Sequence, residues 1–276
     1  MSEAIDGAAH LQARETAQQS AQRGLVRLYG AEGLARLQAS HVMVVGVGGV
    51  GSWAAEALVR SGVGRLTLVD LDEICVSNTN RQLHTDSTTI GRAKAEVLAE
   101  RCRRIAPWAE VRAEVAFFTA KTAEQLLVDR PDFVLDAIDS VKNKAVLIEH
   151  CLRAEIPVAV SGGAGGRRDP TALCRGDLGE SGHDGLLRNL RRRLREVLEL
   201  PSGQPYGVRA VWSKERQVWP TGDGCVTTTP PQGARTQKLD CAEGFGAATM
   251  VTGAFGFALA AEVVEAIVDA AIVGAD

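Results

Sequence analysis

The chain has 276 residues, and its 31 basic and 34 acidic side chains give a formal net charge of −3. This balance excludes a protein that coats nucleic acid non-specifically through an overall basic surface. Hydrophobic residues make up 45% and charged residues 24% of the sequence, which excludes a chain that is mostly disordered. The six cysteines never form a CxxC pair, so we expect neither a ribbon-type zinc site nor a thioredoxin-like redox motif.

The first 22 residues are rich in Ala, Gln and charged side chains. They lack the basic start and apolar run of a secretory signal, so we expect a disordered leader over residues 1–22. Free thiols fit a reducing compartment, which predicts a cytoplasmic protein.

From residue 41 onward, short β-branched runs alternate with longer segments of helical periodicity. This alternation predicts a Rossmann-like α/β fold with a doubly wound, mostly parallel sheet. Strands are expected at residues 41–45, 65–70, 111–115, 132–136 and 157–160, and helices at residues 50–61, 92–105, 120–128 and 141–154.

After residue 161 the pattern loosens into a glycine-rich loop, and we treat residues 162–276 as a C-terminal α/β extension of the same fold. Residues 217–237 show no periodicity and are expected to form a mobile loop. The apolar residues 245–273 predict one or two buried helices. Residues 244–261 carry no charge, but their Gly, Ala and Thr content favours a core helix over a membrane span. Further strands are expected at residues 171–177 and 208–213, and a helix at residues 186–198.

The segment VVGVGGVG, residues 44–51, lies between an apolar strand and a helix. Glycines at this position let the backbone approach a phosphate, and the helix start offers free N–H groups to an anion. Asp70 closes the next strand 19 residues after Gly51, where a carboxylate meets ribose hydroxyls. A nicotinamide-dependent oxidoreductase would share these features. The candidate nucleotide-binding glycines are Gly46, Gly48, Gly49 and Gly51.

Cations follow the glycine turn, in SNTNRQ at residues 77–82 and at Lys94. Arg81 and Lys94 suit a triphosphate and a departing pyrophosphate, whereas hydride transfer needs no such cations. Asp136 and Asp139 end a strand at the edge where open α/β sheets bind ligands. Asp139 is a candidate Mg²⁺ ligand, and the alternative is that it caps the helix beginning at Val141.

These motifs resemble the adenylation domain of the ubiquitin-activating, molybdopterin-pathway and thiamine-pathway enzymes, from about residue 23 to residue 161. Within that superfamily the chain looks most like the tRNA threonylcarbamoyladenosine dehydratases. RLYG, SNTNRQ, DAIDSVKNKAVLI, SGGAGG and DCAEGFGAATMVT carry this resemblance. It implies a homodimer that uses ATP and Mg²⁺, without zinc, and an N-terminal arginine, Arg23 or Arg27, that reaches the neighbouring subunit. It also implies that Gly49 lies against phosphates, that Asp70 binds ribose, and that the triphosphate meets Ser77, Asn78, Asn80, Arg81 and Lys94, with Asp139 near the metal.

The implied activity is ATP-dependent dehydration of threonylcarbamoyladenosine in tRNA, by adenylation of its carboxylate and then cyclisation. Cys241 is a candidate nucleophile for the acyl adenylate, although cyclisation does not require one, and a small buried core residue is the alternative. Cysteine desulfurase or sulfur-acceptor proteins are possible partners by the same resemblance. The competing hypotheses are an activating enzyme for the C-terminal glycine of a ubiquitin-like sulfur carrier, an NAD-dependent oxidoreductase, and a nucleotide-binding scaffold.

A tRNA substrate needs a basic surface, and LLRNLRRRLRE supplies arginines within a predicted helix. Residues 167–216 hold eleven basic and seven acidic side chains, whereas the rest of the chain is net acidic. Helical spacing places Arg188, Arg191, Arg192 and Arg195 on one face, where they could contact phosphates. Arg167 and Arg168 are expected to add to the same surface, and an ordinary solvated amphipathic helix is the alternative.

Overall fold

Seven strands form the central sheet: β1 (His41–Val45), β2 (Arg65–Val69), β3 (Glu110–Glu114), β4 (Phe133–Asp136), β5 (Val158–Ser161), β6 (Leu173–Asp177) and β7 (Arg209–Ser213). The computed structural model describes residues 2–199, 201, 203–230 and 245–269. The strand order is β3-β2-β1-β4-β5-β7-β6, and all pairs are parallel except β6 with β7. The predicted mostly parallel α/β sheet is therefore confirmed.

The strand order reverses direction between β1 and β4, which are hydrogen-bonded neighbours although β2 and β3 come between them in sequence. Adjacent connections at such a switch point run to opposite faces of the sheet and leave a crevice at the carboxyl ends of the strands. The glycine-rich turn follows β1 directly, and Asp139 lies just after β4. The fold thus places both motifs at the same crevice.

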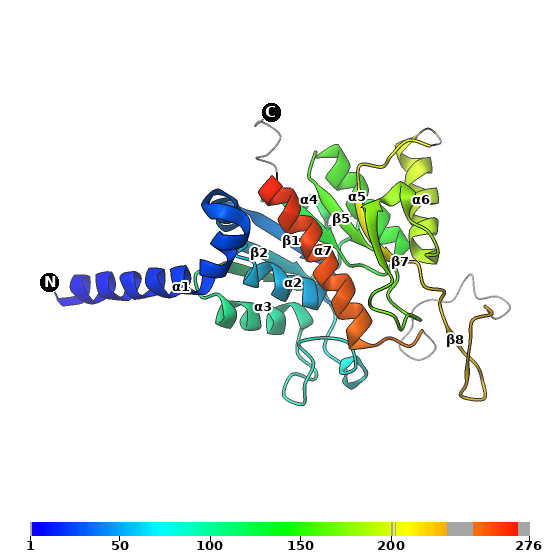
Figure 1. The fold of residues 1–276 in the computed structure, drawn as a ribbon, viewed down its shortest axis with the longest axis horizontal. Coiled ribbons are helices and arrows are strands. Elements are labelled where there is room, and N and C mark those ends of the chain that lie inside the picture. Colours follow the sequence, from blue (N-terminus) through cyan, green and yellow to red (C-terminus); the bar gives the residue numbers. More distant parts are fainter. Residues whose placement is uncertain (1, 200, 202, 231–244, 270–276) are drawn as a thin grey trace.

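Helices cover both faces of the sheet (Figure 1): α1 (Ser2–Ala39), α2 (Gly51–Arg60), α3 (Lys94–Ile105), α4 (Ala123–Leu126), α5 (Val141–Arg153), α6 (Gly185–Leu198) and α7 (Thr249–Asp269). Alternate side chains of β1 serve the two cores, because successive strand residues point to opposite faces. Val42 and Val44 join the core formed with α2, α3 and α7, whereas Met43 and Val45 join the core formed with α5 and α6.

Helix α7 lies against α2 and crosses the sheet beside β5 and β7 (Figure 1). Among the described residues it is the one helix long and apolar enough to cross a membrane, by length and composition alone. More than half of its most apolar stretch is buried inside the protein, including Phe255, Leu259 and Val263. This packing is that of the predicted core helix.

Three segments differ from the sequence predictions. Residues 2–22 of the expected disordered leader are helical and belong to α1, which has a non-helical residue at Gly30. Helix α4 is only four residues long: a turn that the Thr122 hydroxyl closes by accepting the Thr119 amide precedes it, and Leu127 has already left the helical conformation. The predicted mobile loop contains a short antiparallel pair, β8 (Trp219–Pro220) and β9 (Val226–Thr227).

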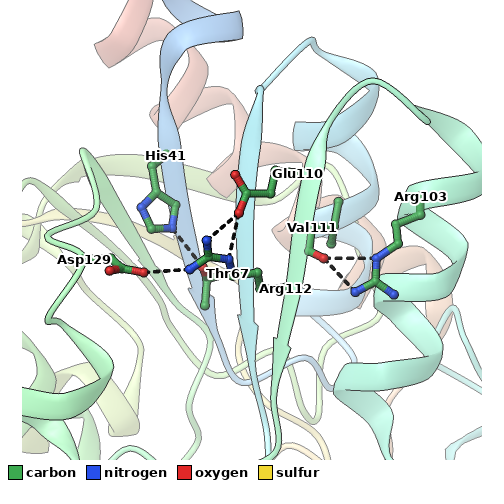
Figure 2. Close-up of polar contacts among 7 residues, drawn as sticks. All are labelled: His41, Thr67, Arg103, Glu110, Val111, Arg112 and Asp129. Atoms are coloured by element: carbon green, nitrogen blue, oxygen red, sulfur yellow. Dashed lines mark hydrogen bonds and ion pairs between the residues drawn. The ribbon is translucent and has the colours of Figure 1, made fainter. Parts of the chain in front are cut away.

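Polar contacts occur on and beside strands β1, β2 and β3, away from the cavity described below (Figure 2). The ring of His41 in β1 hydrogen-bonds the Thr67 hydroxyl in β2 at 2.8 Å. Arg112 in β3 pairs with Glu110 and, at 2.9 Å, with Asp129. None of these residues lines the crevice, so they belong to the scaffold rather than to the candidate site.

Candidate nucleotide and substrate site

A cavity of about 580 Å³ opens at the carboxyl ends of β2, β1, β4 and β5. This cavity is lined by ten of the eleven residues predicted to bind the nucleotide. The sequence placed these residues only along the chain, and the fold brings them together. These residues are Gly46, Gly48, Gly49, Asp70, Ser77, Asn78, Asn80, Arg81, Lys94 and Asp139.

The predicted residue outside this lining is Gly51, the first residue of α2. A Cβ at Gly51 would collide with the carbonyl oxygen of Gly46, so this glycine lets the helix pack on the turn. Gly46 has φ +83° and would place a Cβ 2.9 Å from the carbonyl oxygen of Ala137. Gly48 and Gly49, between them, have more space and face the cavity.

Asp70 follows β2, and its carboxylate is fixed from both sides. One oxygen accepts the Val47 amide at 2.8 Å, and the other accepts the Asp72 amide at 2.9 Å. Burial raises the pKa of Asp70, and the positive charge of Lys94 opposes that shift. A carboxylate held rigidly beside a glycine turn is suited to accept the hydroxyl hydrogens of a ribose.

Lys94 begins α3, and its ammonium forms an ion pair with Asp72 at 2.8 Å. Its side chain is only 8% exposed, so this cation is held inside the cavity rather than on the surface. The desolvated charge interacts more strongly with a phosphate than a surface lysine would.

Arg81 is fixed by its own segment. Its guanidinium donates to the Ser77 carbonyl and to the Asn80 side chain, both at 2.9 Å. The carbonyl of Arg81 accepts from the indole of Trp53 at 3.1 Å and from the hydroxyl of Thr252 at 3.3 Å, which anchors the segment to α2 and α7. The cation is thus positioned before any ligand arrives.

The two asparagines of this segment have structural contacts of their own. Asn78 is 3% exposed, and its side-chain oxygen accepts the Cys75 amide at 3.1 Å. Asn80 donates to the carbonyl of Ala247 at 2.8 Å, while the Thr249 hydroxyl donates back to the Asn80 carbonyl at 2.6 Å. These bonds connect the cation-bearing segment to the start of α7.

The two acids after β4 have different environments. Asp136 is fully buried in an ion pair with Lys144 at 3.0 Å, and burial raises its pKa while Lys144 opposes the shift. Asp139 is exposed and lines the cavity. Helix α5 is capped by Ser140, not by Asp139, so the alternative structural role considered for Asp139 is wrong.

A second loop, the glycine loop of residues 161–166, forms another part of the cavity wall after β5. Asp184 holds this loop by accepting the Gly163 amide at 2.8 Å. The other oxygen of Asp184 accepts the Leu187 amide at 2.9 Å and caps α6. One buried carboxylate therefore connects the cavity wall to the arginine-rich helix.

The four α6 arginines predicted to contact tRNA differ in exposure and in their contacts. Arg188, Arg192 and Arg195 are exposed and lie on one helical face. Arg191 is half-buried, and its guanidinium donates to the backbone and hydroxyl of Ser181. Arg191 thus holds its own helix against the preceding turn.

Arg167 does not extend this basic surface, contrary to the sequence prediction. It is 2% exposed, and its guanidinium donates to the His183 carbonyl at 2.7 Å. Burial lowers the pKa of Arg167 while Asp184 and Glu215 oppose the shift, as expected for a guanidinium inside the protein.

Arg23 and Arg27 are exposed on α1, and neither lines the cavity of its own chain. Cys241 lies outside the described residues. Within residues 2–199, 201, 203–230 and 245–269, no group of three or more His, Cys, Asp or Glu side chains could hold a metal ion.

The structure adds site residues that the sequence did not single out. Asp72, Gln82 and Asn143 line the cavity, and Asp184 supports its wall. Gln82 lies within SNTNRQ, and Asp72 follows Asp70 by two positions, so local motifs offered a signal for both. Asp184 offered none, because 21 residues separate it from its partner Gly163.

The ThiF family model matches residues 20–274. A tRNA threonylcarbamoyladenosine dehydratase of Escherichia coli (strain K12) is 46% identical over 237 residues, which cover 85% of this chain and 88% of that protein. The chain belongs to the tRNA threonylcarbamoyladenosine dehydratases of the ThiF family.

Other members of this family are also similar to the chain over most of its length. The dehydratase of Haemophilus influenzae is 42% identical, with 88% of this chain and 91% of that protein covered. The solved structure of "TcdA (CsdL)" has a TM-score of 0.86, 42% identity, and coverage of 93% of this chain and 97% of that chain. The E. coli dehydratase in complex with ATP has a TM-score of 0.82, 41% identity and the same coverage.

Similarity to the molybdopterin-synthase adenylyltransferases covers a smaller part of the chain. The molybdopterin-synthase adenylyltransferase of E. coli (strain K12) is 36% identical over 141 residues, which cover 51% of this chain and 55% of that protein. The dehydratases match both the nucleotide-binding part and the C-terminal extension, so they are the better guide to this ThiF-family chain.

Proposed function

We propose that this protein uses ATP to dehydrate threonylcarbamoyladenosine in tRNA to its cyclic form. The observation that carries the proposal is the single cavity that brings Asp70, Arg81 and Lys94 together beside the glycine turn. Relatives named as tRNA threonylcarbamoyladenosine dehydratases, one of them solved with ATP, supply the substrate class. The oxidoreductase hypothesis is not favoured, because the buried Lys94 and the half-buried Arg81 in the same cavity suit a triphosphate.

The reaction has two steps. An oxygen of the threonyl carboxylate attacks the α-phosphorus of ATP and displaces pyrophosphate, which leaves an acyl adenylate. A nitrogen of the carbamoyl unit then attacks the acyl carbon, loses its proton and displaces AMP. AMP keeps the carboxylate oxygen, so the nucleoside loses the elements of one water molecule. Both steps depend on positioning and on stabilisation of negative charge.

The chain's own residues provide these two effects. Asp70 orients the nucleotide through its ribose, and the backbone at Gly48 and Gly49 approaches the phosphates. Arg81 and Lys94 stabilise the charge that develops as pyrophosphate departs. Their guanidinium and ammonium groups are held at 2.9 Å and 2.8 Å by partners of the same chain, so little reorganisation is needed during the reaction.

Mg²⁺ fits Asp139, an exposed carboxylate in the cavity that is released from capping α5 by Ser140. Bound there, the metal would neutralise phosphate charge through oxygen ligands. Cys241 remains a candidate nucleophile for the acyl adenylate. A Cys241→Ser protein that retains full turnover would remove that covalent role.

The tRNA contacts proposed for α6 are made by Arg188, Arg192 and Arg195. These exposed side chains share one face of a helix that Asp184 connects to the cavity wall. A phosphate backbone lying along this face would bring the tRNA close to the cavity.

We further propose a homodimer in which Arg23 or Arg27 enters the partner's site. Both arginines are exposed on α1 beside Val26 and Leu28, which are 40% and 70% exposed. Exposed apolar side chains next to a cation suit an interface that delivers a charge. Mixing an Arg27→Ala chain with a Lys94→Met chain would restore activity only if sites are shared, and the same mixture with Arg23→Ala tests the other arginine. A cytoplasmic location and a sulfur-acceptor partner complete the proposal.

The decisive experiment incubates the protein with threonylcarbamoyladenosine-containing tRNA, ATP and Mg²⁺, then analyses the nucleosides by mass. The proposal predicts ATP-dependent loss of one water from that nucleoside. Retention of the unchanged nucleoside would refute it. If pyrophosphate exchange then appears only with a Gly-Gly-tailed protein, the sulfur-carrier hypothesis takes its place.

A further inference from the structure

An aromatic pair lies at the cavity next to the glycine loop. Phe245 lines the cavity, and its ring packs on the ring of Trp219 with centroids 4.4 Å apart and an angle of 55° between the planes. Both side chains are half-buried, so one surface of the pair is covered by protein and part of it stays accessible. The functions assigned to the cavity so far do not use these rings.

The backbone around the pair holds it in place. Gly166 donates its amide to the Gly246 carbonyl at 2.8 Å and accepts the Val218 amide at 2.9 Å. The segments that carry Phe245 and Trp219 are therefore both bonded to one residue of the glycine loop. A Cβ at Gly166 would lie 2.8 Å from the Phe245 ring, which shows how closely the backbone supports it. An aromatic surface fixed in this way loses little entropy when a ligand stacks on it.

Charged side chains are unevenly distributed in the cavity, so one part suits a phosphate group and another part suits an uncharged ring. Asp70 and Asp139 follow β2 and β4, and Lys94 pairs with Asp72, so these three charges lie at the strand ends. Arg81 lies between them and the aromatic pair, because its partner Asn80 bonds the Ala247 carbonyl. The described lining residues near the pair, namely residues 161–165, Leu186 and residues 245–247, include no charged side chain. This side does not suit a phosphate, but it suits a flat, uncharged ring.

We propose that Phe245, positioned by Trp219, is the stacking surface for the modified adenine base of the tRNA. This inference rests on the proposed function. An enzyme that acts on a base substituent must take the base out of its stack, and aromatic side chains are the usual surface for an unstacked base. The related enzyme is named for N6-threonylcarbamoyladenosine, so the reacting carboxylate extends from the edge of the base. Stacking on Phe245 would leave that edge pointing toward the nucleotide side of the same cavity.

The test compares Phe245→Leu, Trp219→Leu and Phe245→Tyr with the unaltered protein. Leucine keeps an apolar side chain but removes the ring, and tyrosine keeps the ring. Val128→Ala is the control, since Val128 is an apolar side chain that is 76% exposed and does not line the cavity. The measurements are KM for tRNA, KM for ATP, and the Kd of threonylcarbamoyladenosine-containing tRNA without ATP.

We expect Phe245→Leu to raise KM and Kd for tRNA about tenfold while KM for ATP stays unchanged, as loss of one stacked base predicts. Trp219→Leu should act in the same direction, Phe245→Tyr should keep tight binding, and Val128→Ala should change neither constant. Unchanged tRNA binding in Phe245→Leu, or an equal rise in KM for ATP, would overturn the stacking role. An unaltered protein that binds this tRNA without dehydrating it would refute the proposed function, and the Kd comparison would still decide about Phe245.

Discussion

Asp184 accepts the amide of Gly163 at 2.8 Å with one carboxylate oxygen and caps α6 with the other. The cavity wall and the basic helix therefore share one hydrogen-bonding residue, buried to 6% exposure. Any displacement of the N-terminus of α6 must move this carboxylate and the glycine loop with it.

Asp184→Ala should destabilise the protein by about 2 kcal/mol, because it removes a helix cap and leaves the Gly163 amide without its partner. It should also lower kcat/KM, since the cavity wall loses its support. Urea denaturation and dehydration kinetics measure the two effects. Asp177→Ala is the matched control: Asp177 caps the short helix at residues 178–180 and accepts the amides of Gly179 and Tyr206, outside the cavity. It should reduce stability while KM stays unchanged, and an equal effect of both variants on KM would contradict a specific role for Asp184.

Lys94→Met should lower kcat for dehydration about 10²-fold or more, because a buried cation beside the leaving group is lost. The ion pair with Asp72 disappears as well, so stability must be measured alongside the rate. Pyrophosphate exchange in the presence of tRNA isolates the adenylation step. Lys142→Met on the exposed face of α5 provides the control, and a Lys94→Met protein with normal exchange would rule out its proposed role.

Asp139→Asn should raise the Mg²⁺ concentration needed for half-maximal activity, because an amide is a weaker metal ligand than a carboxylate. The effect on unfolding should be small, since Asp139 is exposed and Ser140 caps α5. Asp129→Asn, in the exposed ion pair with Arg112, is the control. The same Mg²⁺ dependence in all three proteins would exclude Asp139 as the metal ligand.

Replacement of Arg188, Arg192 and Arg195 by alanine should weaken tRNA binding and make its salt dependence shallower. Each lost phosphate contact reduces the slope of log K against log salt by about one. The control is Arg104→Ala, an exposed residue of α3. Arg191→Ala should behave differently and reduce stability, because its guanidinium holds Ser181. Unchanged binding by the triple variant would remove the proposed tRNA face.

Stability should fall as pH drops from 6.5 to 4, and His84 should account for about 3 kcal/mol of that fall. Burial lowers the pKa of His84 to about 4, with the charge of Lys94 as a second cause. Below pH 6.5 His84 binds a proton in the unfolded state but stays neutral in the folded state. Falling pH therefore favours unfolding until it reaches the pKa of His84 in the folded protein. Burial also lowers the pKa of His41, which acts in the same direction.

Urea denaturation between pH 7 and pH 4 measures this dependence. His84→Gln should flatten it, because glutamine does not titrate. His183→Asn is the control, since the His183 side chain is exposed and asparagine tolerates its φ of +53°. An unaltered pH dependence in His84→Gln would show that other groups cause the loss of stability.

The strands and most helices could be predicted from local pattern. Alternating β-branched runs, a glycine turn and an acid 19 residues later depend only on short-range sequence, so β1, β2 and Asp70 were found within a residue or two. The predictions failed where side-chain contacts, rather than hydrophobic periodicity, decide how long a helix is or whether a side chain is buried. Helix α4 begins three residues later than predicted, after the turn that the Thr122 hydroxyl closes, and Arg167 is buried with its guanidinium donating to the His183 carbonyl.

The sequence by itself determined the fold class, the nucleotide turn and the identity of the cations, because each depends on residues close together in the chain. The tertiary structure decided which of those residues share a cavity, which arginines of α6 remain accessible, and where the aromatic pair lies. Ser140 rather than Asp139 caps α5, and Asp184 meets Gly163 across 21 residues. The Ser140 cap depends on local backbone geometry that the choice between two adjacent polar residues does not reveal, and the Asp184 contact depends on how the loop after β5 packs against the start of α6.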